Sequence, residues 1–228
     1  MSRLFSQTFS CSHCGAPQEM GIVASINADR RPDLREAVLD DRYQRGECSA
    51  CGKGYRVEPD LTYLDVGRGQ WILVRPASDL AEWAPTEALA AAAFDRAHGA
   101  GAPDEAQEAG LQPRLAFGWP AFREKLLCAA HGLDDVALEL AKLAVMRSAR
   151  DLPLDDALEL RLSGVAADSL TLTWTMAGGD LAVEQLTLPR ALLDGLAHDV
   201  AWAPARAELT AGPYVDLNRL LVPADEAA

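Results

Sequence analysis

The sequence predicts an α+β fold, because its pattern of apolar residues changes twice along the 228 residues. Near the N-terminus, short segments of alternating character surround two cysteine pairs. Residues 119–149 instead place apolar side chains three or four positions apart, which is typical of amphipathic helices. From residue 158 onward, apolar and polar residues alternate, which is typical of half-buried strands. We therefore expect strands at both ends of the chain and helices between them.

In the first part of the chain, strands are expected on both sides of the first cysteine pair, over residues 4–10 and 18–26. A short helix is expected over Pro32–Asp41, because proline is tolerated in a first helical turn. Three further β-like segments follow, with a turn at residues 67–70 that predicts a hairpin between the last two. These segments are Tyr55–Glu58, Leu61–Val66 and Trp71–Arg75.

The middle of the chain is expected to be helical, over Pro85–His98 and then over two helices within residues 119–149. Gly132 should end the first of this pair, because glycine accepts the left-handed conformation of a helix C-cap. Asp134 should cap the second helix and Asp135 should favour its first turn, where a negative charge is stabilised. Glu139 and Lys142 are expected to pair across three positions of the same helix.

The last third is expected to be rich in β-structure, with a single helix. Strands are predicted over residues 158–163 and 170–176, and a hairpin turn at residues 177–180 leads to a return strand at 183–188. The helix follows Pro189. We divide the chain into 1–80 (cysteine-rich segment and β extension), 81–150 (helical segment, with a mobile loop near 99–110) and 151–228 (β-rich C-terminal segment). The alternative is that residues 80–228 pack as one domain.

Four of the five cysteines form two C-x2-C pairs, Cys11 with Cys14 and Cys48 with Cys51, and each pair is followed by glycine. Two intervening residues make a tight turn that directs both sulfurs to one point, and glycine lets backbone N–H groups turn toward them. Four thiolates are the ligand set of a structural Zn²⁺ ion. The sequence thus predicts a zinc ribbon extended by β-strands. Because the four ligands close the shell, catalytic zinc is not expected.

Other interpretations of the cysteines remain open. The two pairs could be unrelated thiols, a thioredoxin-like motif is a weaker alternative, and iron could occupy the four thiolates of a heterologously produced sample. His13, inside the first pair, is expected to face solvent. Cys128 and His131 are three positions apart on a helix, as a nucleophilic pair would be. We expect instead a small buried Cys128 and a His131 in the last helical turn.

The composition argues against some partners. The formal net charge is −13, and residues 1–60 carry only −1 of it. An acidic body repels phosphate backbones, so nucleic acid is an improbable partner for the whole chain. The sequence shows neither a signal peptide nor an apolar segment of membrane-spanning length. We therefore expect a cytoplasmic protein, and the excess of arginine over lysine points to a bacterial source.

With these motifs placed, the sequence resembles the CpXC family of bacterial and archaeal proteins over roughly residues 7–150. The resemblance is carried by CSHCG, ASINADRRPDLREAVL, CSACGKGYRVEP, YLDVGRGQWILVRP and GWPAFREKLLCAAHGLDDVALELAK. Ser12 and Ser49 stand where the family has the proline of its C-P-x-C motifs. The resemblance implies a zinc ribbon, carried onto Cys11, Cys14, Cys48 and Cys51, and it implies no reaction.

Three functions follow as hypotheses. The first is a non-enzymatic, zinc-stabilised scaffold or protein-interaction module, whose partner is another protein or a second copy of the chain. The second is a nucleic-acid-binding ribbon, which would use Tyr43, Tyr55 and the arginines near the cysteines, namely Arg30, Arg31, Arg35, Arg42, Arg45 and Arg56. The third is a metal-dependent enzyme using the acids of the helical segment, Asp134, Asp135 and Glu139, beside His131. The five tryptophans are expected to be core or interface anchors, and Trp83 and Trp119 are the two among them that are candidates for partner contacts.

Overall fold

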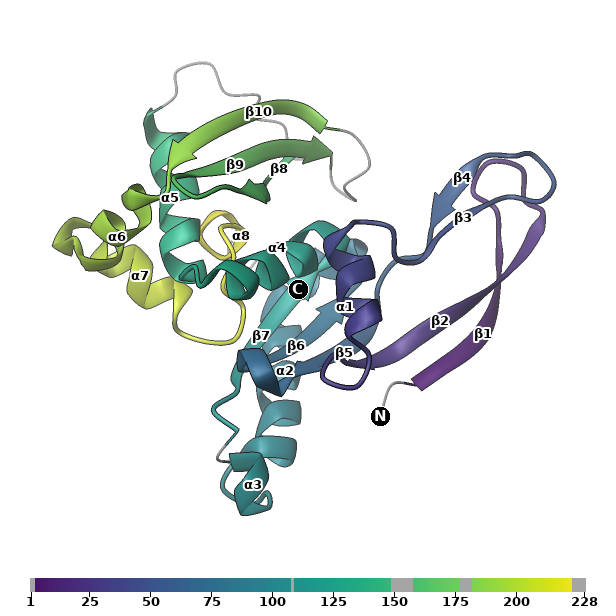
Figure 1. The fold of residues 1–228 in the computed structure, drawn as a ribbon, viewed down its shortest axis with the longest axis horizontal. Coiled ribbons are helices and arrows are strands. Elements are labelled where there is room, and N and C mark those ends of the chain that lie inside the picture. Colours follow the sequence, from purple (N-terminus) through teal and green to yellow (C-terminus); the bar gives the residue numbers. More distant parts are fainter. Residues whose placement is uncertain (1–2, 108, 149–157, 177–181, 223–228) are drawn as a thin grey trace.

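The computed structural model describes residues 3–107, 109–148, 158–176 and 182–222 (Figure 1). Its larger sheet has five strands in the order β1–β2–β5–β6–β7. β1 (Arg3–Ser10) and β2 (Pro17–Asn27) form an antiparallel hairpin. Only the last three residues of β2 pair with β5 (Leu61–Asp65), in parallel. Most of the β1–β2 hairpin therefore extends beyond the body of the protein.

The rest of this sheet forms the body. β5 and β6 (Gln70–Arg75) are antiparallel, and the short helix η1 (Val66–Arg68) makes the predicted turn between them. β6 then pairs in parallel with β7 (Gln112–Phe117) at the other edge. A second small hairpin, β3 (Arg45–Glu47) with β4 (Gly54–Arg56), lies beside the far end of β1 and β2 (Figure 1). We call these two hairpins, residues 3–27 and 45–56, the arm.

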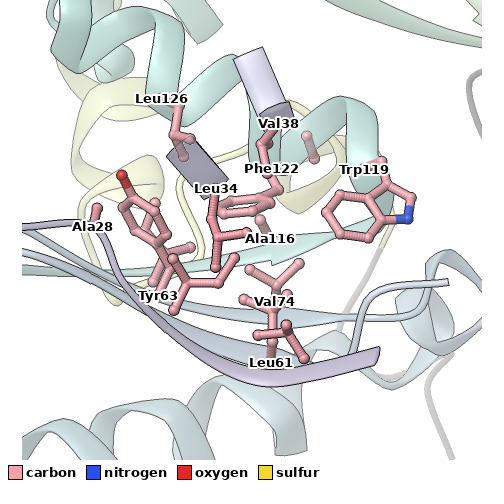
Figure 2. Packing of buried hydrophobic residues seen from close by; sticks show 14 residues of the cluster. Ala28, Leu34, Val38, Leu61, Tyr63, Val74, Ala116, Trp119, Phe122 and Leu126 are labelled. Carbon is pink, nitrogen blue, oxygen red and sulfur yellow. The ribbon is translucent and has the colours of Figure 1, made fainter. Parts of the chain in front are cut away.

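Helices cover both faces of the body sheet, which explains why its central strands are buried on both sides. On one face, α1 (Pro32–Leu39) and α4 (Gly118–His131) pack on Ile72 and Val74 around Phe122 (Figure 2). On the other face, Trp71 of β6 and Leu115 of β7 join a cluster with α2 (Trp83–His98), and η2 (Ala77–Glu82) leads into that helix. Alternate residues of one strand thus enter two different apolar clusters.

The C-terminal part builds a separate three-stranded antiparallel sheet in the order β10–β9–β8. Its strands are β8 (Leu158–Val165), β9 (Ser169–Met176) and β10 (Ala182–Pro189). Leucines of this sheet pack with α5 (Asp135–Ser148) into a third apolar cluster. The remaining helices around it are α6 (Ala191–His198), η3 (Val200–Trp202), α7 (Ala203–Leu209) and α8 (Asn218–Leu221).

The α+β prediction is confirmed, as are most of the predicted elements in the described residues. Strand β7 and helix α7 were not predicted, and the predicted turn at 177–180 lies outside the described residues. The segment 99–110 contains a four-residue helix, α3 (Asp104–Gln107), and its mobility stays a prediction. The division of the chain near residue 80 also stays a prediction. The larger sheet crosses that point, because β7 belongs to it.

The expectation that Trp83 and Trp119 contact a partner is wrong. Their exposed fractions are 4% and 1%, and both indoles are hydrogen-bonded inside the protein. Trp119 donates to the Val57 carbonyl at 2.8 Å and Trp83 donates to the Val222 carbonyl at 3.2 Å. Both rings therefore act as core anchors, since a buried indole needs a partner for its N–H group. In the part of the chain that the structure describes, no helix has the length and apolarity to span a membrane.

Candidate metal centre

The four cysteines lie at the tips of the two arm hairpins, in turns of the same construction. The Gly15 amide donates to the Cys11 carbonyl at 2.8 Å, and the Gly52 amide donates to the Cys48 carbonyl at 2.9 Å. Both glycines have positive φ, +74° and +67°, as the sequence predicted. Each turn also closes at its base, through the amides of the first cysteines. One local sequence thus builds the same knuckle twice.

The two knuckles bring the four sulfurs together, within 4.8 Å of one another. The Sγ atoms of Cys11 and Cys51 are 3.9 Å apart, and those of Cys14 and Cys48 are 3.7 Å apart. A tetrahedral Zn²⁺ ion with Zn–S bonds of about 2.3 Å requires sulfurs roughly 3.8 Å apart. Cys11 and Cys48 are buried, whereas Cys14 and Cys51 face solvent. The four cysteines can therefore hold a metal ion at the end of the arm.

Backbone N–H groups around the sulfurs favour thiolates. The His13 amide points to the Cys11 Sγ at 3.4 Å, while the His13 side chain is exposed, as expected. The amides of Ala50 and Cys51 lower the pKa of Cys48 to about 7. The Lys53 amide also acts to lower the pKa of Cys51, but desolvation and the three neighbouring sulfurs raise it to about 12. Four thiols this close repel further negative charge, and a cation would relieve that repulsion.

The arm hairpins are also joined by contacts outside the sulfurs. The buried Gln18 side chain of β2 accepts hydrogen bonds from the Ser49 amide (3.1 Å) and hydroxyl (3.3 Å) in the second knuckle. The rings of Phe9 and Tyr55 meet edge to face with centroids 4.9 Å apart. Gly46 is required beside that tyrosine, because a Cβ there would lie 2.5 Å from the ring. These contacts orient the second knuckle against the first.

A second cluster of acidic groups lies in the interior, between α4, α5 and the C-terminal sheet. Carboxylate oxygens of Glu124, Glu139 and Asp216 lie within 4.8 Å of one another, and all three side chains are buried. The ammonium group of Lys142 stands among them, 2.6 Å from Glu124 and 3.0 Å from both oxygens of Glu139. The Arg161 guanidinium bonds to Asp216 and lies 3.4 Å from Glu124. Cationic side chains therefore occupy the place that a metal ion would take.

The same network continues toward the start of α5. Asp135 accepts two hydrogen bonds from Arg114 of β7, at 2.7 and 3.0 Å, and lies 3.1 Å from the Lys125 Nζ. Asp134 caps α5 through the amides of residues 136 and 137, which confirms the predicted cap. The predicted pairing of Glu139 with Lys142 is also confirmed, but both side chains are fully buried. The three-residue spacing alone does not predict that burial.

The environments of the acids push their pKa values in opposite directions. Burial, with the nearby Glu124 and Asp216, raises the pKa of Glu139 to about 7 in spite of Lys142. Burial also opposes ionisation of Asp216, but Arg161 and Lys142 outweigh it and lower that pKa to about 2. Arg114 and Lys125 likewise hold the pKa of Asp135 well below its ordinary value.

These shifts predict a stability maximum in mildly acidic solution. Folded Glu139 keeps its proton up to about pH 7, whereas the unfolded residue loses it near 4.5. Folding thus becomes less favourable as the pH rises from 4.5 to 7. Asp216 acts at lower pH, where its contribution is lost as the pH falls from 3.8 to about 2. Urea unfolding of the zinc-loaded protein should show a smaller free energy of unfolding at pH 7.5 than at pH 5. The variant Glu139→Gln should lack that difference, and an equal slope in both proteins would contradict the assignment.

Cys128 and His131 do not form a nucleophilic pair. Cys128 is buried, and burial together with Glu124 raises the pKa of its thiol well above the ordinary value. His131 is exposed at the C-terminal end of α4, where Gly132 adopts the predicted left-handed cap with φ +60°. The expectation that Cys128 is a small buried side chain is therefore confirmed.

Paired knuckles at the tips of two hairpins, joined to a helix-covered sheet, define a four-cysteine protein of the ribbon type. The chain belongs to the CpXC family, because the family model described as CpXC protein matches residues 9–142. This match confirms the resemblance drawn from the sequence, and it covers both knuckles, the arm from residue 9 onward, the body sheet and residues 135–142 of α5. No curated protein and no solved structure matches the chain.

The serines at the proline positions of the family motif are not equivalent. The Ser49 amide donates to Gln18, which a proline nitrogen cannot do, whereas Ser12 is exposed and its amide donates to no group among the described residues. We expect Ser49→Pro to weaken zinc affinity about tenfold, as the loss of an outer-shell contact does, and Ser12→Pro to leave it nearly unchanged. Competition with a chromophoric chelator measures both. Equal affinities of the two variants would contradict a role for the Gln18 contact.

Proposed function

We propose that Cys11, Cys14, Cys48 and Cys51 bind one structural Zn²⁺ ion and that the protein is a non-enzymatic, zinc-stabilised scaffold or protein-interaction module of the bacterial cytoplasm. The observation that carries the proposal is the spacing of the four sulfurs, which matches a closed tetrahedral shell. A closed shell leaves no position for a reacting water, so the ion serves to fix the arm. Zinc in small modules contributes about 10 kcal/mol or more to folding.

The arm offers a surface for a protein partner. β1 is an edge strand of the larger sheet, and Leu4 and Phe5 on it are about half exposed. An unpaired strand edge with apolar side chains favours pairing with another chain. The simplest such partner is a second copy of this protein, which carries the same edge.

The other two functions have less support. Five of the six arginines near the cysteines pair with acids rather than forming a cationic face: Arg31 with Asp33, Arg35 with Asp65, Arg42 with Asp40, and both Arg45 and Arg56 with Asp41. Arg30 is the exception, exposed and without an ion pair among the described residues. Phosphate binding would have to displace these acids. An enzyme that used the acids of the helical segment would need a metal where the Lys142 ammonium lies.

Native mass spectrometry with elemental analysis of the same sample tests both parts of the proposal. We expect one zinc per chain in a discrete oligomer. Phe5→Lys should shift the mass toward the monomer without changing the zinc content, whereas Val200→Lys, at a residue that is 82% exposed elsewhere, should change neither. No zinc uptake, with four free thiols after zinc is supplied, would overturn the metal site. A zinc-loaded monomer that captures no partner through β1 would overturn the interaction surface.

A further inference from the structure

A cavity of about 330 Å³ lies on the body, away from the arm, between the β5–β6 turn, the start of β7 and the helices α4 and α5. Arg68, Gln70 and Arg114 line it from the sheet, and Lys125, Cys128 and Asp135 line it from the helices. Its size is at the lower end of the range for small-molecule pockets. The rest of the lining comes from Gly69, Gly110 and Gln112 on the sheet side and from Ala129 and Leu133 on the helix side.

Two polar atoms of the lining lack hydrogen-bond partners. They are the Arg68 Nη1 and the Gln70 Oε1, and both are buried without a partner among the described residues. The orientation of the Gln70 amide is fixed, because its Nε2 donates to the Lys125 carbonyl at 3.0 Å. The cavity therefore presents one cationic donor and one neutral acceptor. Buried polar groups are rarely left unpaired, so these two atoms are candidates for hydrogen bonds to a ligand.

The charge of the lining favours an anion. Arg68, Arg114 and Lys125 are cationic, and Asp135 is the single acid of the lining. Asp135 is already paired with Arg114 at 2.7 Å and with Lys125 at 3.1 Å, and Lys125 also lies 3.8 Å from Glu139, so none of these acids is paired with Arg68. A net positive cavity on a chain of charge −13 is a local exception to the acidic surface. Such a cavity attracts small anions from solution.

We infer that this cavity is a binding site for a small organic anion that also carries a hydroxyl group, such as a hydroxycarboxylate. A carboxylate oxygen would accept from the Arg68 Nη1, and the hydroxyl of the ligand would donate to the Gln70 Oε1. Cys128 lies at the helix side of the cavity as a neutral thiol and acts as wall, not as reactant. The site is separate from the metal arm, so its occupancy does not depend on the proposed function.

Calorimetric titration of the full-length, zinc-loaded protein tests the inference with a matched pair of probes. Malate carries the hydroxyl and succinate is the same dicarboxylate without it. We expect malate to bind about tenfold or more tightly than succinate, because succinate leaves the Gln70 acceptor unpaired. Arg68→Met should weaken malate binding about 10- to 100-fold. Gln70→Met should abolish the preference for malate while succinate binding changes little.

The control variant is Arg96→Met, which removes the same charge from an exposed position of α2 and should leave malate binding unchanged. Thermal unfolding of each variant in the absence of probe separates a lost contact from a lost fold. We would test malate, succinate, 3-phosphoglycerate and inorganic phosphate at concentrations up to about 10 mM, because a functional site should bind its ligand with a Kd below roughly that value. If none of the four binds, the site is overturned. Equal weakening by Arg68→Met and Arg96→Met would show a general charge effect and would overturn it too.

Discussion

Replacing Lys142 with methionine should lower the free energy of unfolding by about 3–5 kcal/mol at pH 7.5, because it leaves buried carboxylates without their cation. The Lys142 ammonium lies 2.6 Å from Glu124 and 3.0 Å from Glu139, and none of these side chains reaches solvent. The loss is a large part of the 5–15 kcal/mol that typically separates folded from unfolded states. Urea unfolding of the zinc-loaded protein measures it directly.

The effect should depend on pH, which distinguishes it from a simple packing defect. Without the ammonium, Glu139 and Glu124 bind protons more readily in the folded state, so the variant should recover stability as the pH falls from 7.5 to 5. Arg96→Met removes the same charge from an exposed position of α2 and should change the stability by no more than about 0.5 kcal/mol. A loss below 1 kcal/mol, or a loss that is independent of pH, would show that the network is not the charged one described here.

Cys48→Ala should remove the metal ion and unfold the arm while the body stays folded. Cys48 is the buried thiol of the second knuckle, and three thiolates do not close a tetrahedral shell. The three apolar clusters of the protein contain neither Cys11 nor Cys48, and the only arm residues buried in them are Val23 and Ile26, at the end of β2 next to the body sheet. The packing of these clusters therefore does not require the metal. Hydrogen exchange should become at least about 100-fold faster for amides of the two knuckles, since they lose most of the local stabilisation.

The fifth cysteine provides the control. Cys128→Ala removes a buried thiol from α4, far from the arm, and should keep one zinc per chain at a cost of about 1 kcal/mol. In Cys48→Ala, the amides of β9 and α5 should retain their slow exchange. If those amides also lose their protection, the arm and the body unfold as one cooperative unit and the local role of the metal is wrong.

Local patterns predicted the candidate metal centre well, because its geometry is set within a few residues. The spacing of Cys11 and Cys14, and the glycine that follows them, are sufficient to predict a knuckle and its positive φ. The hairpins β1–β2 and β5–β6 were predictable for the same reason, since each joins neighbours in sequence. The contact between the two knuckles was expected only because one tetrahedral zinc site needs all four thiols.

Strand β7 shows what local pattern misses. Its last three residues, Leu115 to Phe117, are all buried, because helices cover both faces of the sheet. Such a strand has no alternation of apolar and polar residues to detect. Its partner β6 lies some forty residues earlier and runs parallel, with the long helix α2 between them. The contact depends on tertiary packing that no local window of sequence contains.

The buried network was predictable only in part. The three-residue spacing of Glu139 and Lys142 indicated a pair, but a pair of that spacing is ordinarily exposed. Its burial depends on Arg161 and Asp216, which come from β8 and the segment before α8. The available signal was the presence of charged residues among the apolar positions of both helices α4 and α5. The cavity was likewise missed, since its lining comes from four separated segments.

The position of Arg161 and Asp216 has a practical consequence for anyone who shortens this chain. The family match ends at Lys142, which belongs to the buried charge network. A fragment truncated where the match ends would keep Glu124 and Glu139 but would lack Arg161 and Asp216. Such a fragment would also lack Leu162, whose amide donates a hydrogen bond to the Glu124 carboxylate in the whole protein. The region that homologues share and the region that folds independently thus have different borders. A fragment that contains the family segment should therefore be expressed together with the C-terminal sheet.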